Sequence, residues 1–300
     1  MSATLDNNNN ADTGLVVQTQ RRHFLVRMPS TEVLQCVAQG RDWQLACGDK
    51  VTVNVAQKAI TALLPRTRLF YRADAFKQKL LAANVSQVVI VCAADPLPNV
   101  GLLNRSLVAA EATGVKVLLV ANKADLPNQE PLHQALRPLN GLPYRLVSLS
   151  SLDERGVETQ LKPLLMHEQS VFVGQSGVGK SSLLNTLLGE ARQKVGELSM
   201  RSAHEGSGKH TTTFSQLFHL EAHNEHSWLV DSPGVQVFGL AHLNAAERLA
   251  AFPEFRALAG HCRFRDCGHS HEQSCALKTA VSKGVAHESR LQMLREFLHD

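Results

Sequence analysis

Short apolar runs separated by turn residues dominate the first part of the chain. Between residues 14 and 64 about five such runs follow one another, rich in β-branched residues and bounded by polar turns such as Gly48-Asp49-Lys50. The runs are 15–17, 24–26, 33–37, 51–55 and 59–64. Five short strands at this spacing predict a small closed β-barrel, for which the OB-fold is the natural candidate.

The pattern changes after residues 65–68, where continuous apolar runs begin to alternate with helical periodicity. Residues 88–93 and 115–120 predict two buried strands, and the stretch 102–113 between them predicts a helix that Gly114 ends. Buried strands joined by crossover helices indicate a parallel α/β sheet. In such sheets the functional residues gather at the carboxyl ends of the strands.

Beyond Gly234 the strand signal fades and helical periodicity takes over. Residues 244–260 look helical with an interruption near Pro253, and residues 286–298 predict a helix with an apolar face. We therefore expect four segments, which are a polar tail (1–12), an OB-fold RNA-binding domain (13–66), an α/β domain (67–238) and an α-helical C-terminal domain (239–300).

A glycine-rich loop lies between the apolar run 170–173 and the helical pattern 182–188. Its residues are Gly174, Gln175, Ser176, Gly177, Val178, Gly179, Lys180, Ser181 and Ser182. The glycines allow backbone N–H groups to turn toward an anion, and the helix that follows adds positive partial charge. Lys180 would reach the outer phosphates of a nucleoside triphosphate, and the Ser181 hydroxyl would ligate Mg²⁺. The strand before the loop and the helix after it favour a phosphate-binding loop over an accidental glycine turn.

The loop after the second buried strand predicts which base is bound. It consists of Asn122, Lys123, Ala124 and Asp125. The Asp125 carboxylate is able to accept hydrogen bonds from both N1–H and N2–H of guanine, a pairing that adenine lacks, while Asn122 contacts the base edge and the Lys123 stem packs beside the ring. Next to a phosphate-binding loop, this motif favours a guanine site over a polar turn.

Two further strand ends carry polar loops. One begins at Ser148, which shapes a loop whose Leu149 N–H would contact guanine O6, with an ordinary serine turn as the alternative. The other is Asp231-Ser232-Pro233-Gly234, in which Asp231 would hold Mg²⁺ through water and the Gly234 N–H would sense the γ-phosphate. The base-specificity loop precedes the phosphate-binding loop in the chain, which indicates a circular permutation of a nucleotide-binding domain.

The polar segment 196–213 lies where the first switch of a GTPase is expected. Thr212 is the favoured threonine for closing on Mg²⁺ and the γ-phosphate, with Thr211 as the alternative. Val235 stands where a Ras-like enzyme has a glutamine that orients water. His210 is then the available group for positioning the attacking water, since the near-neutral pKa of a histidine suits that role.

Cysteine and histidine cluster near the C-terminus. Cys262, Cys267, His269 and Cys275 supply three thiolates and one imidazole within 14 residues, and His271 is a competing ligand. Four such ligands complete a closed tetrahedral Zn²⁺ site, which predicts one structural metal ion. The basic residues around this cluster either contact phosphates or form a solvated face, and they are Arg263, Arg265, Lys278 and Lys283.

The barrel carries a candidate RNA surface. Phe24 and Trp43 would stack on bases, with a solvated barrel rim as an equally good alternative. The basic residues of this surface are Arg21, Arg22, Arg27, Arg41, Lys50 and Lys58.

Composition and charge bear on the partners and the cellular compartment of the protein. Its 300 residues are 44% hydrophobic, and 31 basic against 27 acidic side chains permit nucleic-acid binding without requiring it. Because the sequence has no membrane-length apolar run and no signal-peptide core, we expect a cytoplasmic protein without a membrane partner. Cys36, Cys47 and Cys92 are then expected to be reduced thiols in apolar surroundings.

Together these motifs resemble the ribosome small-subunit-dependent GTPase A family, the circularly permuted GTPases that assist late assembly of the bacterial 30S particle. The resemblance spans residues 14–298 and includes the barrel turn Gly48-Asp49-Lys50-Val51, the loops described above and the cysteine cluster. It implies an OB-fold, a permuted GTPase domain and a zinc domain. It also implies that His269 is the zinc ligand and that His210 is the catalytic histidine.

The resemblance further implies GTP hydrolysis to GDP that the small subunit stimulates, contact with 16S rRNA, and release of a monomeric protein after hydrolysis. The leading hypothesis is therefore an enzyme that acts as a timer. The alternative is an RNA-binding OB/zinc module whose nucleotide site only stabilises the fold, and a tRNA-directed GTPase is a third possibility.

Overall fold

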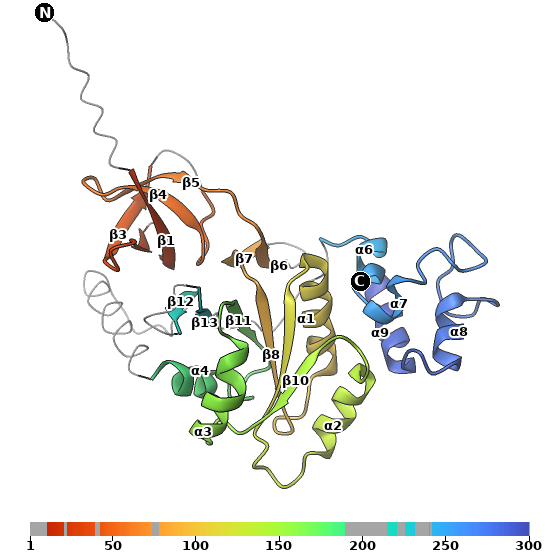
Figure 1. Cartoon of the computed structure of the whole chain (residues 1–300). Helices are drawn as coiled ribbons and strands as arrows, with labels where there is room; N and C mark the ends of the chain where they lie inside the picture. The colour runs from red at the N-terminus through yellow and green to blue at the C-terminus, as the bar shows by residue number, and fades with distance from the viewer. Residues whose placement is uncertain are drawn as a thin grey trace, which may run out of the picture.

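The computed structural model describes residues 11–20, 23–39, 43–73, 78–189, 215–220, 226–231, 240 and 242–299. Three parts follow one another in Figure 1. A barrel forms the N-terminal part, a sheet flanked by helices forms the centre, and a group of short helices forms the C-terminal part.

The N-terminal part is a closed barrel of five strands. They are β1 Ala11–Gln20, β2 His23–Arg27, β3 Val33–Ala38, β4 Lys50–Asn54 and β5 Ala59–Leu63. The strand order is β1-β2-β3-β5-β4, and β4 pairs back onto β1 to close the barrel. Side chains alternate along β3 and β4, so that Leu34, Cys36, Val51 and Val53 lie in a buried core. The predicted OB-fold barrel is confirmed.

The central sheet is built from six strands. They are β8 Gln87–Ala93, β9 Lys116–Asn122, β10 Arg145–Ser148, β11 Gln169–Val173, β12 Gln216–His219 and β13 Trp228–Asp231. Their order is β10-β9-β8-β11-β13-β12, and every neighbouring pair is parallel except β12 with β13. The predicted parallel α/β sheet is confirmed. The carboxyl ends of the five parallel strands share one edge, and β11 lies between β8 and β13 although it comes late in the chain.

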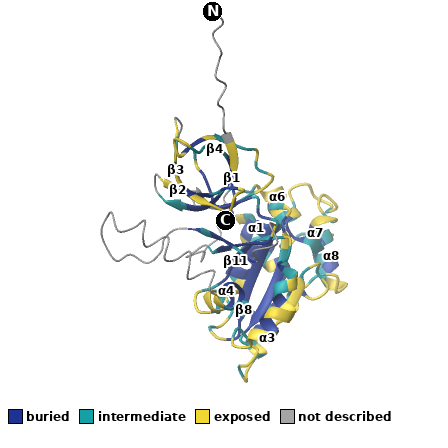
Figure 2. Ribbon diagram, turned by 60° about the vertical axis from the view of Figure 1, so that its left-hand side comes forward, coloured by how far each residue is buried: buried dark blue, intermediate teal, exposed yellow. Residues whose placement is uncertain are grey.

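Helices cover both faces of this sheet, whose strands are mostly buried in Figure 2. Val88 and Ile90 of β8 join one core cluster with α1 Val100–Thr113, whereas Val89 and Val91 join a second cluster with α4 Lys180–Leu188. Helix α1 ends at Gly114 in the left-handed conformation, as the sequence predicts. The shorter helical elements are α2 Glu130–Leu136, η1 Arg137–Leu139, α3 Glu154–Gly156, η2 Val157–Leu161 and η3 Lys162–Leu164.

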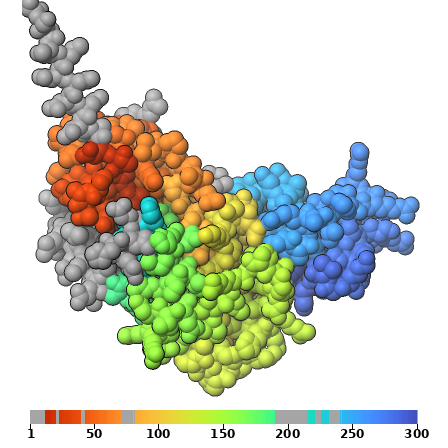
Figure 3. All heavy atoms as spheres, viewed as in Figure 1, coloured from red at the N-terminus to blue at the C-terminus, as the bar shows by residue number. Residues whose placement is uncertain are grey.

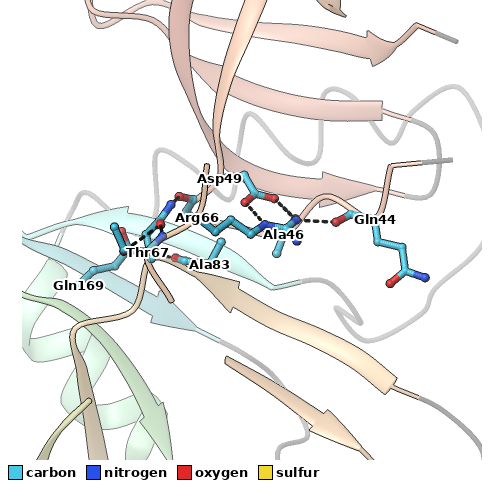
Figure 4. A network of polar contacts seen from close by, with 9 residues as sticks. Gln44, Ala46, Asp49, Arg66, Thr67, Ala83 and Gln169 are labelled. Carbon is cyan, nitrogen blue, oxygen red and sulfur yellow. Dashed lines mark hydrogen bonds and ion pairs between the residues drawn. The ribbon is translucent and has the colours of Figure 1, made fainter. Parts of the chain in front are cut away.

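The Gly48-Asp49 turn fixes the barrel to the central sheet (Figure 4). Asp49 is buried and accepts hydrogen bonds from Arg66 Nε at 2.7 Å and Arg66 Nη2 at 2.8 Å. The hydrogen bond to Asp49 raises the pKa of Arg66, so the guanidinium stays charged. Gly48 has a φ of +90°, and a Cβ there would lie 2.3 Å from the Ala83 carbonyl oxygen, so this close approach requires glycine.

Two further contacts tie the barrel to the sheet. Strand β1 pairs with β12 at Gln18 and Gln216, and the Cys47 thiol donates to the Ser215 carbonyl oxygen at 2.9 Å. A hairpin of β6 Leu69–Ala73 and β7 Gln78–Ala83 lies at the same junction, where the Ala83 N–H donates to the Cys47 carbonyl oxygen at 2.8 Å. The barrel sheet and the central sheet therefore form one continuous sheet of eleven strands.

The C-terminal part consists of α6 Ala245–Ala250, α7 Pro253–Arg256, α8 Ala276–Ser282 and α9 Glu288–His299. Pro253 separates α6 from α7, as the sequence predicts. Leu291, Leu294 and Phe297 of α9 are buried in the core cluster that also contains the inner face of α1. Within the described ranges, no helix is long and apolar enough to span a bilayer.

A buried arginine joins α9 to α7 and α1. Arg290 is 1% exposed, its Nε lies 2.6 Å from Glu254 Oε1, and another of its nitrogens donates to Asn104 Oδ1. The guanidinium also lies 4.4 Å from the centroid of the Phe252 ring. This single side chain therefore links the C-terminal helices to the central part through charge, hydrogen bonding and packing.

Candidate nucleotide site and metal centre

The glycine-rich loop 174–182 follows β11 and opens α4, as predicted. Gly177 and Gly179 have φ values of +82° and +94°, in the left-handed region that glycine adopts without strain. Lys180 folds over the loop, with Nζ 2.7 Å from the Gly174 carbonyl oxygen and 2.8 Å from that of Gln175. Burial lowers the pKa of Lys180, and the negative charge of Asp231 opposes that shift. The Lys180 amino group therefore lies within the loop, where it is able to reorient toward a bound anion.

Asn122 ties the base-specificity loop to the phosphate-binding loop. Its side chain is fully buried, and Nδ2 donates to the Val178 carbonyl oxygen at 2.8 Å. Its Oδ1 accepts the Ser151 N–H at 2.9 Å. Gly179 makes this approach possible, because a Cβ there would lie 2.2 Å from Asn122 Nδ2. The structure thus gives Asn122 a role in joining three loops, and its contact with the base edge stays a prediction.

The turn after β9 presents Asp125 to solvent. Lys123 has a φ of 61°, and its Nζ donates to the Asp95 carbonyl oxygen at 2.8 Å. Gln129 holds the turn from below by donating to the carbonyl oxygens of Lys123 and Leu126 at 2.9 Å each. Asp125 is exposed at the carboxyl edge of the sheet, where a ligand is able to reach it.

The loop after β10 differs from the sequence prediction. Leu149 is 4% exposed, and its N–H donates to the Ala121 carbonyl oxygen at 3.0 Å, so in this structure it is not available to guanine O6. Ser148 is exposed at the end of β10. Ser151, which sequence reasoning missed, contacts Asn122 instead. The serine-rich spacing hid this register, because three serines in four residues allow more than one alignment of the loop.

Asp231 ends β13 beside β11, and its charge acts on Lys180. The carboxyl ends of β9, β11 and β13, which are distant in the sequence, therefore lie at one edge of the sheet. Three further predicted site residues, His210, Thr212 and Gly234, lie outside the described residues.

The four predicted metal ligands converge in the C-terminal part. The ligand atoms of Cys262, Cys267, His269 and Cys275 all lie within 4.8 Å of one another. His269 Nδ1 lies 3.6 Å from Cys262 Sγ and 3.5 Å from Cys275 Sγ, and these two sulfurs are 3.8 Å apart. A tetrahedral zinc ion with usual bond lengths places its sulfurs about 3.8 Å apart and sulfur and nitrogen about 3.5 Å apart. The arrangement therefore fits zinc closely.

A second layer of contacts holds this cluster. The Glu272 carboxylate accepts the N–H groups of Gly268 at 2.6 Å and Ser270 at 2.8 Å, on either side of His269. Backbone hydrogen bonds of this kind lower the pKa of Glu272. The Arg295 guanidinium donates to the His269 carbonyl oxygen at 2.7 Å. His271, the competing ligand of the sequence analysis, is exposed and lies outside the group.

The two aromatic residues predicted for the barrel's RNA surface pack in or against the barrel core. Phe24 is 8% exposed within the barrel core and does not present a free ring to RNA, whereas Trp43 is partly buried and packs against the same core. Arg27, one of the basic residues predicted for that surface, instead places its guanidinium 5.4 Å from the centroid of the Trp228 ring of β13. Lys50 and Lys58 are exposed, whereas Arg21, Arg22 and Arg41 lie outside the described residues.

The phosphate-binding loop follows an inner strand of the parallel sheet, and the base-specificity loop, which comes earlier in the chain, contacts it through Asn122. This arrangement defines a circularly permuted P-loop GTPase. Comparison with known proteins narrows this class. A family model described as RsgA GTPase matches residues 63–241. The chain belongs to the RsgA GTPase family, and it is accordingly a GTP hydrolase.

Relatives align along nearly the whole chain. A protein of Neisseria meningitidis serogroup B named small ribosomal subunit biogenesis GTPase RsgA is 42% identical over 287 residues, covering 95% of this chain and 91% of the relative. A protein of the same name from Nitrosomonas europaea is 41% identical, covering 93% and 88% of the two chains.

Two solved structures are similar. The crystal structure of YjeQ from Thermotoga maritima matches with a TM-score of 0.73 and 27% identity, covering 96% of this chain and 98% of that one. The structure of YloQ, described as a circularly permuted GTPase, matches with a TM-score of 0.71 and 23% identity, covering 99% and 97%, and shows the same fold.

Proposed function

We propose that this GTPase binds the small (30S) ribosomal subunit late in its maturation and hydrolyses GTP to time its own release. The observation that carries the proposal is the convergence of the Asn122–Asp125 loop with the glycine loop, in a chain that aligns over 95% of its length with a protein named for small-subunit biogenesis. The ligands are GTP and GDP, and the macromolecular partner is the 30S subunit with its 16S rRNA.

We assign the residues of the site as follows. Asp125 recognises the guanine edge, Ser148 shapes the neighbouring loop, and Lys180 moves from the loop carbonyl oxygens onto the outer phosphates. Ser181 and Thr212 would hold Mg²⁺, which neutralises charge on the phosphates during transfer.

The remaining assignments concern the switches. Asp231 would hold Mg²⁺ through water, the Gly234 N–H responds to the γ-phosphate, and His210 positions the attacking water. Support for Asp231 comes from its charge, which already acts on Lys180. Hydrolysis would remove the contacts to the γ-phosphate and so loosen both switches, which is the physical basis of a timer.

We also propose one structural zinc ion on Cys262, Cys267, His269 and Cys275, supported by the ligand distances. The proposed domains are OB-fold 13–66, GTPase 67–238 and zinc domain 239–300, preceded by the tail 1–12. The protein is proposed to be a cytoplasmic monomer.

The test is the steady-state GTPase rate of the purified protein alone, with 30S subunits, with 50S subunits and with tRNA. The proposal predicts a slow basal rate that rises strongly with 30S subunits only. Stimulation by tRNA instead would indicate a tRNA-directed enzyme, and no stimulation by active 30S subunits would refute the proposal.

A second measurement addresses the alternative, an RNA-binding module with a structural nucleotide site. The affinity for 30S subunits is compared between a non-hydrolysable GTP analogue and GDP. A timer requires tighter binding with the analogue, whereas equal affinities mean that the nucleotide shifts no equilibrium.

A further inference from the structure

We infer that Phe264, between Arg263 and Arg265, is a stacking platform for an unpaired RNA base. The inference rests on the proposed function only for the identity of the RNA. Phe264 lies in the loop between the metal ligands Cys262 and Cys267.

Exposure singles out this ring. Phe264 is 47% exposed, and it is the aromatic member of the large exposed hydrophobic side chains within the described ranges. The other phenylalanines of the C-terminal part, at 252, 255 and 297, are buried. An exposed benzyl group is an apolar face whose burial by a ligand would be favourable. A single exposed apolar side chain is common on protein surfaces, so the charges around this ring have to identify the ligand.

Charge indicates which ligand covers the ring. Arg263 and Arg265 are both exposed, and the Arg263 guanidinium lies 5.6 Å from the centroid of the Phe264 ring. Every nucleobase has a flat face for an aromatic ring, and the phosphates on either side of an unpaired base match two flanking arginines. An apolar protein surface would leave both guanidinium groups without partners. The occupant favoured by this tripeptide is therefore single-stranded RNA.

The loop is short and fixed at both ends. Cys262 and Cys267 belong to the four-ligand group, and the Gly268 N–H that follows Cys267 donates to Glu272 at 2.6 Å. A platform held in this way loses little conformational entropy when it binds. The segment between α7 and α8, which carries the loop, projects at the side of the molecule opposite the barrel (Figures 1 and 3).

This surface also replaces the stacking site that the sequence suggested. Phe24 belongs to the barrel core and Trp43 is partly buried against it, whereas the barrel lysines at 50 and 58 are exposed. The loop between Cys262 and Cys267 therefore carries an aromatic ring that is more exposed than either Phe24 or Trp43, between two exposed arginines. Stacking selectivity is expected from the C-terminal part.

The experiment uses the full chain with its metal bound. The Kd is measured for 30S subunits and for a fluorescent, unstructured oligoribonucleotide, with Phe264→Ala, Phe264→Trp and Val285→Ala. Val285 is 64% exposed in the same part of the molecule, so Val285→Ala is the matched control for losing exposed apolar surface. Metal content and basal GTPase rate verify that each variant is folded.

Phe264→Ala is expected to weaken binding of both RNA ligands by about 5- to 100-fold, Phe264→Trp to restore it, and Val285→Ala to leave it unchanged. Arg263→Gln and Arg265→Gln should each reduce the slope of log Kd against log salt concentration by about 0.7 on the oligonucleotide.

Unchanged binding by Phe264→Ala, or failure of Phe264→Trp to restore binding, would overturn the inference. So would a loss confined to 30S subunits, because the ring would then contact a ribosomal protein. The proposed function is tested separately, since 30S stimulation of the wild-type GTPase rate stands or falls without reference to Phe264.

Discussion

Removing the carboxylate charge of Glu254 should destabilise the protein strongly. Glu254→Gln keeps the size of the side chain but leaves the Arg290 guanidinium buried without a counter-charge, since the two side chains are only 2% and 1% exposed. Breaking a buried ion pair by removing one partner costs about 3–5 kcal/mol. The Asn104 and Phe252 contacts of Arg290 are neutral and cannot replace the lost charge.

The chain provides a matched control. Glu111 pairs with Arg256 at 2.6 Å and also joins α1 to α7, but the Arg256 side chain is 52% exposed. Water screens this pair, so Glu111→Gln should cost at most about 1 kcal/mol. Both substitutions remove one carboxylate that pairs with an arginine, and the two pairs differ in how far that arginine is exposed, 52% for Arg256 and 1% for Arg290.

The free energy of unfolding of the two variants is compared by urea unfolding, followed through a signal that reports on the C-terminal helices. With a slope of about 2–3 kcal/mol/M, Glu254→Gln should lower the midpoint by about 1–2.5 M and Glu111→Gln by at most about 0.5 M. Equal shifts, or no shift in Glu254→Gln, would show that Arg290 does not depend on its buried partner and would refute the reasoning.

Three further predictions concern the site and the metal. Gly179→Ala should weaken GTP binding at least about tenfold in a fluorescence titration, because the added Cβ would lie 2.2 Å from the buried Asn122 Nδ2. Gly141→Ala is the control, since Gly141 also has a positive φ but lies in open space, and it should leave GTP binding unchanged. His210→Ala should lower kcat at least about 100-fold with nearly unchanged GTP affinity; unchanged turnover would remove His210 from the mechanism. Burial raises the pKa of Cys47 and of Cys92 to about 12, so at pH 8 only about one in 10,000 of these thiols is ionised. A thiol titration should therefore find them silent in the folded protein, while a chelator releases three fast-reacting thiols; an unchanged count after chelation would contradict the metal site.

Hydrophobic periodicity predicted the barrel and most of the central sheet. Alternation along β4 and continuous burial along β8 are direct consequences of having one or two covered faces, so they are visible in the residue pattern. The hairpin β6–β7 and strand β12 were not predicted. Strand β12 is four residues long and pairs with β1 of the barrel. A pairing partner that distant in the sequence leaves no local signal.

The contacts of the buried polar side chains could not be predicted from the sequence. Arg290 occupies a core position that periodicity reserves for an apolar residue, and only the positions of Glu254 and Asn104 in the fold explain it. Asn122 was predicted from its motif, but its two hydrogen bonds to other loops depend on tertiary contacts. Phe24 was a surface candidate because an aromatic residue near arginines looks the same whether it faces RNA or the barrel core.

The account depends most directly on Asp125 reading guanine from a loop that precedes the phosphate-binding loop. Xanthine carries an oxygen where guanine carries N2–H, so the side-chain amide that Asp125→Asn introduces pairs with xanthine and not with guanine. Initial rates with GTP and XTP should show kcat/KM for GTP falling at least about 100-fold and XTP becoming the better substrate. Asp153→Asn, in the neighbouring loop, should keep the preference for GTP. Undiminished use of GTP by Asp125→Asn would contradict the central claim.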